Sequence, residues 1–343
     1  MRLLIYTDVH WSKTSSIIRE KGKRLANVKD SVNWAENYAR IANCDAIVCL
    51  GDFFDSPSLD AEEMTYLVNT KWDRTLPHYF LVGNHEMADA SREFFSTQIL
   101  NMYDFMTVIS ETCCIKSGDT DIIFLPYMCS DDIKPFKEYI EETGCHSKKR
   151  IVLSHNDLQA QYGFYKSNIG FTIDEIEQNC DLFVNGHLHN GSKVSDKVIN
   201  LGNLTGQNFN EDAYFYSHNV MVLDTDTLEY SLVENPYAFN FYKIKISSLD
   251  DFNSHIEHMA TNAVISLTVP EKDADEVRKR LEEMLNKIGA YRLTIEAEAS
   301  DANIVESAEE LQVDHLNSFV EYVKKTIGMS DNIITELSEV CKV

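Results

Sequence analysis

The chain has 343 residues, of which 44% are hydrophobic, and it carries a formal net charge of −24. This length suits two domains, or one large domain with an appendage, and the composition supports a sizeable core. The acidic charge argues against a protein that wraps nucleic acid by overall electrostatic attraction, although basic residues cluster locally.

The apolar runs and the cysteine spacing indicate the cellular compartment that we expect for the protein. The apolar run before Asp8 is too short for a signal peptide or a membrane span, and no other run approaches the length of a span. The eight cysteines are scattered without a CxxC pair, and Cys113 and Cys114 are adjacent. We therefore expect reduced cysteines and a cytoplasmic protein, of a bacterial cell or, if phage-encoded, of its host, with no membrane association.

In chain order, short apolar runs typical of strands alternate with segments of helical spacing up to about residue 190. The expected strands are 2–8, 45–52, 78–84, 105–110, 112–118, 121–127, 150–155 and 181–187. The expected helices are 25–42, 60–74, 91–103 and about 132–144. This alternation predicts an α/β fold with a helix-covered sheet, followed by antiparallel strands near 198–235.

A second alternation of strand-like and helical segments begins at about Phe241 and predicts a small α+β module. Its expected strands are 241–246, 263–269 and 291–299, with one helix between the first two strands and another over 273–288. A polar, acidic segment follows and is typical of a linker. The expected organisation is a first domain 1–238, the α+β module 239–299, a linker 300–308 and a C-terminal helix pair 309–343.

Five of the expected strands end in small sets of His, Asp and Asn. These ends are Asp8-Val9-His10, Gly51-Asp52 with Asp55, Gly83-Asn84-His85-Glu86, Ser154-His155 and Gly186-His187-Leu188-His189. An isolated HxH pair is more often two surface histidines than half of a metal site. Loops at the carboxyl ends of parallel strands, however, gather at one edge of a sheet, so all five sets are predicted to meet in one crevice.

The order DxH, GDxxD, GNHE, H, GHxH resembles that of the calcineurin-like metallophosphoesterases, from residue 3 to about 235. The resemblance implies a two-sheet β-sandwich flanked by helices, which binds two divalent metal ions. It implies two ligand sets that share one carboxylate: Asp8, His10 and His189; Asn84, His155 and His187; and the bridging Asp52. His85 resembles the family's catalytic histidine, which faces the phosphate and is not a ligand. Asp55 is expected to orient His10 or a loop.

The residue types of these sets are consistent with that chemistry. Mixed nitrogen and oxygen ligands without a thiolate favour Mn²⁺, with Mg²⁺, Fe²⁺ or Zn²⁺ as alternatives, and argue against a structural zinc. A shared carboxylate holds two ions about 3.5–4 Å apart, which suits an in-line displacement at phosphorus. His85 would donate to the phosphate or protonate the leaving oxygen.

Within the superfamily the chain looks most like SbcD and the MRE-eleven nucleases, and closest to their small phage versions. The DVHW start, the GDFFD loop, the α+β module and the terminal helix pair carry this resemblance. It implies a DNA nuclease, acting as exonuclease on duplex ends and as endonuclease, in an SbcCD-like recombination and repair complex. The α+β module would cap the site, and residues 309–343 would bind a coiled-coil ATPase of the SbcC/Rad-fifty type. Helices 60–74 and 91–103 would form a homodimer.

Several alternatives stay open. The chain could be a stand-alone phosphatase or nucleotide phosphodiesterase, or an adaptor with a vestigial site. The basic segment Arg19 to Arg24, in which Lys21, Lys23 and Arg24 are expected to contact the DNA backbone, could be a solvated loop. The apolar groups of 60–74 and 91–103 could be core-facing stripes, and the helix pair 309–343 could fold back onto the α+β module.

Overall fold

The computed structural model describes residues 1–14, 18, 20–129, 133–159, 161–162, 165–284 and 288–296. Met1–Ile295 form one compact unit. The expected linker 300–308 and helix pair 309–343 lie outside the described residues, as does Arg19. Of the helices in the described ranges, none combines the length and apolar character that crossing a membrane requires.

The first sheet has six strands in the order β16-β15-β1-β2-β3-β4. Strands β1 to β4 pair in parallel, whereas β15 pairs antiparallel with both β1 and β16. The bounds are β1 (Arg2–Tyr6), β2 (Ala46–Cys49), β3 (His78–Leu81), β4 (Met106–Ile109), β15 (Asn219–Asp224) and β16 (Tyr230–Glu234). The carboxyl ends of β1, β2 and β3 therefore lie at one edge of this sheet.

The second sheet also has six strands, in the order β13-β14-β12-β7-β6-β5. Its four central strands are parallel, and the edge strands β13 and β5 are antiparallel to their neighbours. The bounds are β5 (Cys113–Ser117), β6 (Thr120–Leu125), β7 (Lys149–Ser154), β12 (Leu182–Asn185), β13 (Ser192–Lys193) and β14 (Val198–Asn200). Two short ribbons accompany it, β8 (Leu158–Gln159) with β11 (Phe171–Thr172) and β9 (Gln161–Tyr162) with β10 (Tyr165–Lys166).

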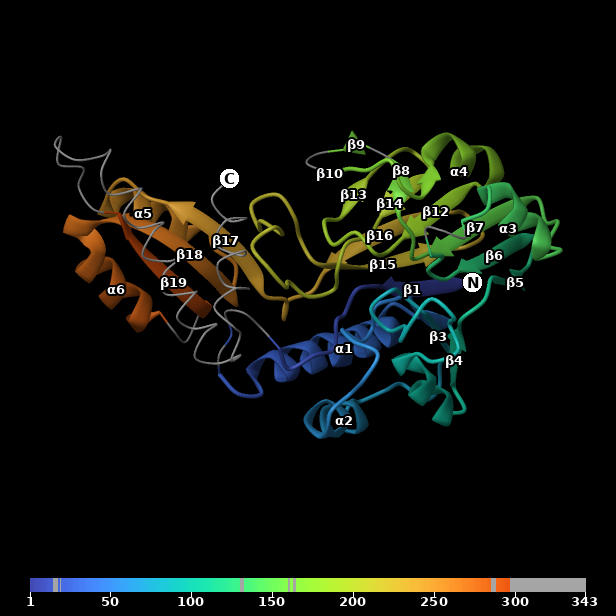
Figure 1. Ribbon diagram of the computed structural model, residues 1–343, viewed down its shortest axis with the longest axis horizontal. Coiled ribbons are helices and arrows are strands. Elements are labelled where there is room, and N and C mark those ends of the chain that lie inside the picture. Colours follow the sequence, from blue (N-terminus) through green and yellow to red (C-terminus); the bar gives the residue numbers. More distant parts are fainter. Residues whose placement is uncertain are drawn as a thin grey trace, which may run out of the picture. The chain divides into compact units, whose positions relative to one another are not determined.

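Alternating side chains of the central strands fill three apolar layers, because successive residues of a strand point to opposite faces. Leu3, Ile5 and Val48 pack between the sheets against residues such as Phe124 and Leu153. The outer face of the first sheet is covered by α1 (Lys23–Ile41) and α2 (Ala61–Val68), and that of the second by α3 (Phe136–Glu142) and α4 (Ile173–Asn179), as Figure 1 shows. The expected two-sheet sandwich flanked by helices is confirmed.

The helices form where the sequence supports them locally. In α1 the buried residues Leu25, Val28, Val32 and Ala35 recur every three or four positions, so one face packs on the sheet. Helix α2 begins with a capping box, in which the Asp60 side chain accepts the backbone N–H groups of residues 62 and 63. The expected helices 25–42 and 60–74 are thus confirmed, the second in shorter form.

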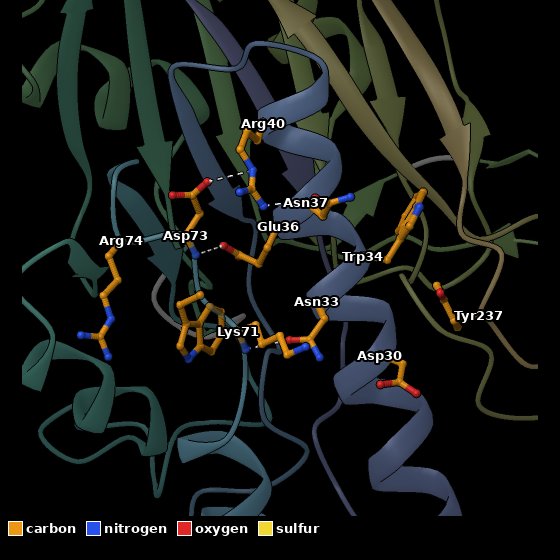
Figure 2. Close-up of a pocket in the computed structure, with 11 residues that line it drawn as sticks. Asp30, Asn33, Trp34, Glu36, Asn37, Arg40, Lys71, Asp73, Arg74 and Tyr237 are labelled. Carbon is orange, nitrogen blue, oxygen red and sulfur yellow. Dashed lines mark hydrogen bonds and ion pairs between the residues drawn. The ribbon is translucent and has the colours of Figure 1, made fainter.

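A hollow of about 720 Å³ lies on the molecular surface beside α1, and Figure 2 shows the residues that line it. Arg40 pairs with Asp73 at 3.8 Å, and the Asp73 backbone N–H donates to the buried Glu36 carboxylate at 2.8 Å. Glu36 also lies 2.9 Å from His78, the first residue of β3. These contacts fasten α1 to the segment before β3. None of the lining residues belongs to the expected ligand sets, so the hollow is separate from the candidate site.

The α+β module has the predicted order of elements. These are β17 (Asn240–Lys245), α5 (Leu249–Glu257), β18 (Ala263–Pro270), α6 (Ala274–Glu283) and β19 (Ile288–Glu296), with the strands in the order β17-β18-β19. The module has its own core, to which Ile265, Leu267, Val277 and Leu281 contribute. The module thus has an apolar cluster of its own within the compact unit Met1–Ile295, and its division from residues 1–238 as a separate domain stays a prediction.

The prediction of a helix over 91–103 is wrong. The segment contains only the 3-10 helix η1 (Ser96–Met102), because Phe95 is extended and bridges Met87, and the Ser96 N–H donates to the Glu86 carbonyl. Phe94 and Met102 are exposed to 64% and 72%. A core-facing stripe therefore does not account for these two side chains, and the homodimer surface stays a prediction. Helix α4 was not predicted at all.

The expectation that the cysteines are reduced is wrong for one pair. Cys114 of β5 and Cys145, which follows α3, form a disulfide across 31 residues of sequence. Cys44, Cys49 and Cys180 are free and buried. The pairing of β5 with β6 and the return of the chain through α3 bring the two cysteines together. Since the fold makes this contact, no short cysteine spacing in the sequence indicates it.

Candidate metal centre

The polar residues that follow β1, β2, β3, β7 and β12 meet in one site, as predicted. The donor atoms of Asp8, His10 and His189 all lie within 4.8 Å of one another. The same holds for Asp52, His155 and His187. These are two sets of atoms that could ligate a metal ion, and each set combines residues from loops far apart in the sequence.

The first set surrounds a carboxylate oxygen that has no hydrogen-bond partner. His10 Nε2 lies 3.0 Å from His189 Nε2 and 3.8 Å from Asp8 Oδ1. Asp8 is fully buried, and its Oδ2 accepts the hydroxyl of Thr7 and the backbone N–H of His187. Its Oδ1 is left unsatisfied. A buried unsatisfied acceptor beside two imidazole nitrogens is what a bound cation would satisfy, so these residues fit a metal ion.

The second set adjoins the first through Asp52. Asp52 Oδ2 lies 3.1 Å from His155 Nε2 and 4.0 Å from His10 Nε2, so the carboxylate stands between the two sets. Asn84 Oδ1 lies 2.9 Å from His187 Nδ1 and 3.3 Å from His155 Nε2. All seven ligands expected from the sequence are thereby brought together, with oxygen and nitrogen donors in both sets.

The backbone at these residues is unusual. Asp8, His10, Asp52 and His187 have φ between 46° and 72°, and they are four of the eight non-glycine residues with positive φ in the described part of the chain. Such conformations are costly and cluster at functional sites. The turn also needs glycine, since a Cβ at Gly83 would lie 2.1 Å from Asp52 Oδ1. The loops are therefore shaped around the donor atoms.

Carboxylates hold the outer ring nitrogens of three histidines. Asp55 lies 2.9 Å from His10 Nδ1, which confirms the expected orienting role of Asp55. Asp157 lies 3.2 Å from His187 Nε2, and Glu211 lies 2.9 Å from His189 Nδ1. Such partners fix the ring orientation and tautomer of metal-ligating histidines.

The sequence interpretation missed Asp157 and Glu211. Asp157 could have been found, because it follows His155 by two residues at the end of β7. Glu211 lies in a polar segment after β14 with no motif of its own, so no signal in the sequence marks it.

Glu86, the last residue of the GNHE motif, has a structural place. Its buried carboxylate accepts the backbone N–H groups of Phe53, Phe54 and Gly83 at 2.6–3.2 Å. Burial and the nearby charge of Asp52 raise the pKa of Glu86 to about 8. Glu86 thereby joins the loop that presents Asp52 to the loop that presents Asn84.

Charge within the site is strongly coupled. Burial opposes the charged form of His10, but the hydrogen bond with Asp55 and the nearby carboxylates of Asp8 and Asp52 raise its pKa to about 10. Burial likewise opposes ionisation of Asp8, yet the charge of His155 and the nearby rings of His10 and His189 lower its pKa to about 2. The same kinds of contact hold the pKa of Asp52 well below its usual range. A metal ion ligated by His10 must displace the proton of that ring, so binding of the ion releases a proton and weakens as the pH falls.

His85 differs from the ligands in exposure. Its side chain is 41% exposed, whereas that of His10 is 2% exposed. Its backbone N–H donates to Asp52 Oδ1 at 2.9 Å, and its ring lies edge-on to His10 with 4.6 Å between centroids. One ring nitrogen also lies within 4.8 Å of donor atoms of His10 and Asp52. His85 is therefore held at the open side of the site, where a substrate could reach it.

The basic segment after β1 is only partly available to a ligand. Lys21 is exposed, whereas Lys23 donates to the backbone carbonyl of Gly289 at 2.8 Å. Arg24 is buried and donates to the Gly206 carbonyl and the Thr205 hydroxyl at 2.8 and 3.0 Å. Burial lowers the pKa of Arg24 to about 10. The structure does not support the expected DNA contact of Arg24, which instead fastens the loop after β14.

Comparison with known proteins agrees with this geometry. The family model of calcineurin-like phosphoesterases matches residues 1–191, which is more than half of the chain. No curated protein matches the chain. Among solved structures it is similar to a dimetal phosphatase from Danio rerio, at 11% identity and a TM-score of 0.35, which covers 68% of this chain and 99% of that one.

A second similar structure is YfcE, a phosphoesterase from E. coli, at 10% identity and a TM-score of 0.30, covering 68% of this chain and 100% of that one. Neither likeness is close enough to inform the site. The family match and the two donor sets indicate a metal-dependent hydrolase of phosphoester bonds with a site for two divalent ions. The chain belongs to the calcineurin-like phosphoesterase family.

Proposed function

We propose that the protein is a dinuclear-metal-dependent DNA nuclease and the nuclease subunit of an SbcCD-like recombination and repair complex. The observation that carries the hydrolytic part is the pair of donor sets on either side of Asp52, with His85 exposed beside them. The choice of DNA is supported by the motif order and by the α+β module that follows the nuclease domain. The mixed nitrogen and oxygen donors favour Mn²⁺.

Different residues of the chain would have different roles in phosphodiester hydrolysis. When bound, two divalent ions would acidify the attacking water and stabilise negative charge on the phosphate. Asp55, Asp157 and Glu211 hold the outer nitrogens of three histidines, so the inner nitrogens stay free to ligate. His85, anchored through its backbone N–H, would donate a hydrogen bond to the phosphate or a proton to the leaving oxygen.

A substrate panel tests the proposal against its alternatives. The protein is incubated with linear duplex DNA, single-stranded DNA, p-nitrophenyl phosphate and its bis ester, each with Mn²⁺ and with EDTA. We expect Mn²⁺-stimulated cleavage of DNA and of the bis ester, lost in EDTA. Hydrolysis of the monoester alone would identify a stand-alone phosphatase, and cleavage of the bis ester without DNA a nucleotide phosphodiesterase. No activity on any substrate would favour an adaptor.

Lys21 offers a test of the DNA contact, with Arg24 as its matched comparison. Because Lys21 is exposed, Lys21→Gln should weaken DNA binding and reduce the salt dependence by about one phosphate contact. Arg24→Gln should instead lower the melting temperature, since it removes buried hydrogen bonds to the loop after β14. Fluorescence anisotropy at several salt concentrations checks the first result, and thermal unfolding the second. An unchanged salt slope in Lys21→Gln would support a solvated loop.

The ATPase partner is proposed to bind residues 309–343. The sequence there repeats apolar residues at helical spacing, which suits docking on a coiled coil. Deleting everything after Ser307 should leave a folded, Mn²⁺-dependent nuclease that no longer binds an SbcC/Rad-fifty-like ATPase in size-exclusion chromatography. Loss of folding or of metal-dependent activity on simple DNA substrates would show that the segment belongs to the nuclease fold.

A further inference from the structure

We propose that Glu211 is a positioning residue for His189, and that the segment carrying it links the α+β module to the first metal set (Asp8, His10 and His189). The link would make occupancy of this set depend on how the module is held. The inference concerns metal binding in this phosphoesterase site, and it does not require DNA to be the substrate.

The carboxylate of Glu211 is buried, with the residue only 2% exposed, and each of its oxygens is engaged. Oε1 lies 2.9 Å from His189 Nδ1 and accepts from the Asn208 side chain at 3.2 Å. Oε2 accepts from the Asn203 side chain at 3.0 Å and from the Gln207 backbone N–H at 2.8 Å. Four contacts in a buried place leave the carboxylate little freedom, so it can fix the direction of the His189 ring.

The fixed ring points its other nitrogen into the metal set. His189 Nε2 lies 3.0 Å from His10 Nε2 and 3.9 Å from Asp8 Oδ1. Asn203 strengthens the arrangement, since its backbone N–H donates to the His189 carbonyl at 3.0 Å while its side chain bonds Glu211. Both the backbone and the outer nitrogen of His189 are therefore held by the segment 203–211.

The same segment is attached to the α+β module immediately after Glu211. Asp212 pairs with Phe241 of β17 in a parallel bridge, and the Ala213 N–H donates to the Phe241 carbonyl at 2.8 Å. The ring of Phe209 lies 5.1 Å from that of Phe241, and the Arg292 guanidinium of β19 lies 5.7 Å from the Phe209 ring centre. Two strands of the module thus contact a segment whose buried carboxylate holds a metal-set histidine.

Glu211 is distinct from the other two outer carboxylates in this respect. Asp55 follows β2 and Asp157 follows β7, so each belongs to a loop of one of the two main sheets. Glu211 adjoins the pairing with β17. A displacement of the module would be transmitted to His189 through one residue, and by linkage an ion at the first set would stabilise the position of the module.

Titration with Mn²⁺ by isothermal calorimetry tests the positioning role in the full-length protein. Glu211→Gln keeps the side-chain size and removes the charge, and we expect it to lower the affinity for one of two Mn²⁺ ions by about 10–100-fold. Asp157→Asn is the matched control at His187, and it should lower the affinity for the other ion. The double variant should lower the affinity for both ions. Wild-type affinity for both ions in Glu211→Gln would overturn the proposal.

The link to the module is tested by a second matched pair. Phe209→Ala removes a ring that packs against Phe241 and leaves Glu211 in place. It should weaken the same ion as Glu211→Gln, by a factor of about 5, the low end of ordinary coupling between sites. Phe252→Ala removes a buried ring of the module's own core and should leave both Mn²⁺ affinities unchanged. Equal effects of the two variants, or none from Phe209→Ala, would refute the link.

Discussion

Asp52→Ala is expected to abolish phosphodiester cleavage and to reduce the number of tightly bound Mn²⁺ ions. The substitution removes the carboxylate between the two donor sets, which lies 3.1 Å from His155 and 4.0 Å from His10. It also leaves the His85 backbone N–H without its acceptor, so the proposed acid loses its anchor. The combined loss should lower kcat by roughly 10³-fold or more, the scale seen when a group that organises transition-state charge is removed.

The matched control is Asp196→Ala, because Asp196 is a surface aspartate whose side chain is 97% exposed. This variant should keep both Mn²⁺ ions and wild-type kcat. Steady-state cleavage of the bis ester and calorimetric Mn²⁺ titration of both variants separate the outcomes. Full activity of Asp52→Ala at saturating Mn²⁺ would contradict a dinuclear centre.

Unlike Asp52→Ala, His85→Gln should lower the rate of cleavage and leave metal binding unchanged. The side chain stands at the open side of the site and its backbone provides the contact to Asp52, so glutamine should leave the donor sets undisturbed. The loss of a proton donor or charge-stabilising group should lower kcat by about 10²–10⁴-fold. Rate and Mn²⁺ stoichiometry are measured on the same preparation.

His146→Gln, which changes an exposed histidine outside the site, is the control and should match the wild type in both measurements. If His85→Gln instead loses one of the two Mn²⁺ ions, His85 is a ligand. That result would be compatible with the proximity of its ring to His10 and Asp52.

The sequence predicts that the residues of the candidate centre meet because they follow a simple rule of architecture. Asp8, Asp52, Asn84, His155 and His187 each come directly after a buried parallel strand or within three residues of its end. Parallel strands place those ends at a common edge, so chain order alone indicates that the residues meet. The outer partner Glu211 escapes this rule, since it comes from an irregular segment whose place depends on pairing with β17.

Two further misreadings have physical causes. Residues 91–103 carry apolar groups at helical spacing, but the bridge between Met87 and Phe95 holds the first part extended. Arg24 belongs to a cluster of basic residues, yet it lies four positions before Val28 on the buried face of α1. If the expected helix 25–42 had been extended by one residue at its start, its periodicity would have placed Arg24 on the buried face.

Asp8, His10, Asp52 and His187 have a left-handed backbone, so selection for stability and selection for metal binding favour different residues at these positions. Aspartate and histidine adopt these conformations more readily than most other residues, yet a glycine would adopt them without the steric cost. Selection for a more stable protein alone would therefore tend to erase the ligands, one position at a time. Directed evolution for thermostability in this scaffold should be paired with a screen for metal binding, since the two properties compete at the same four positions.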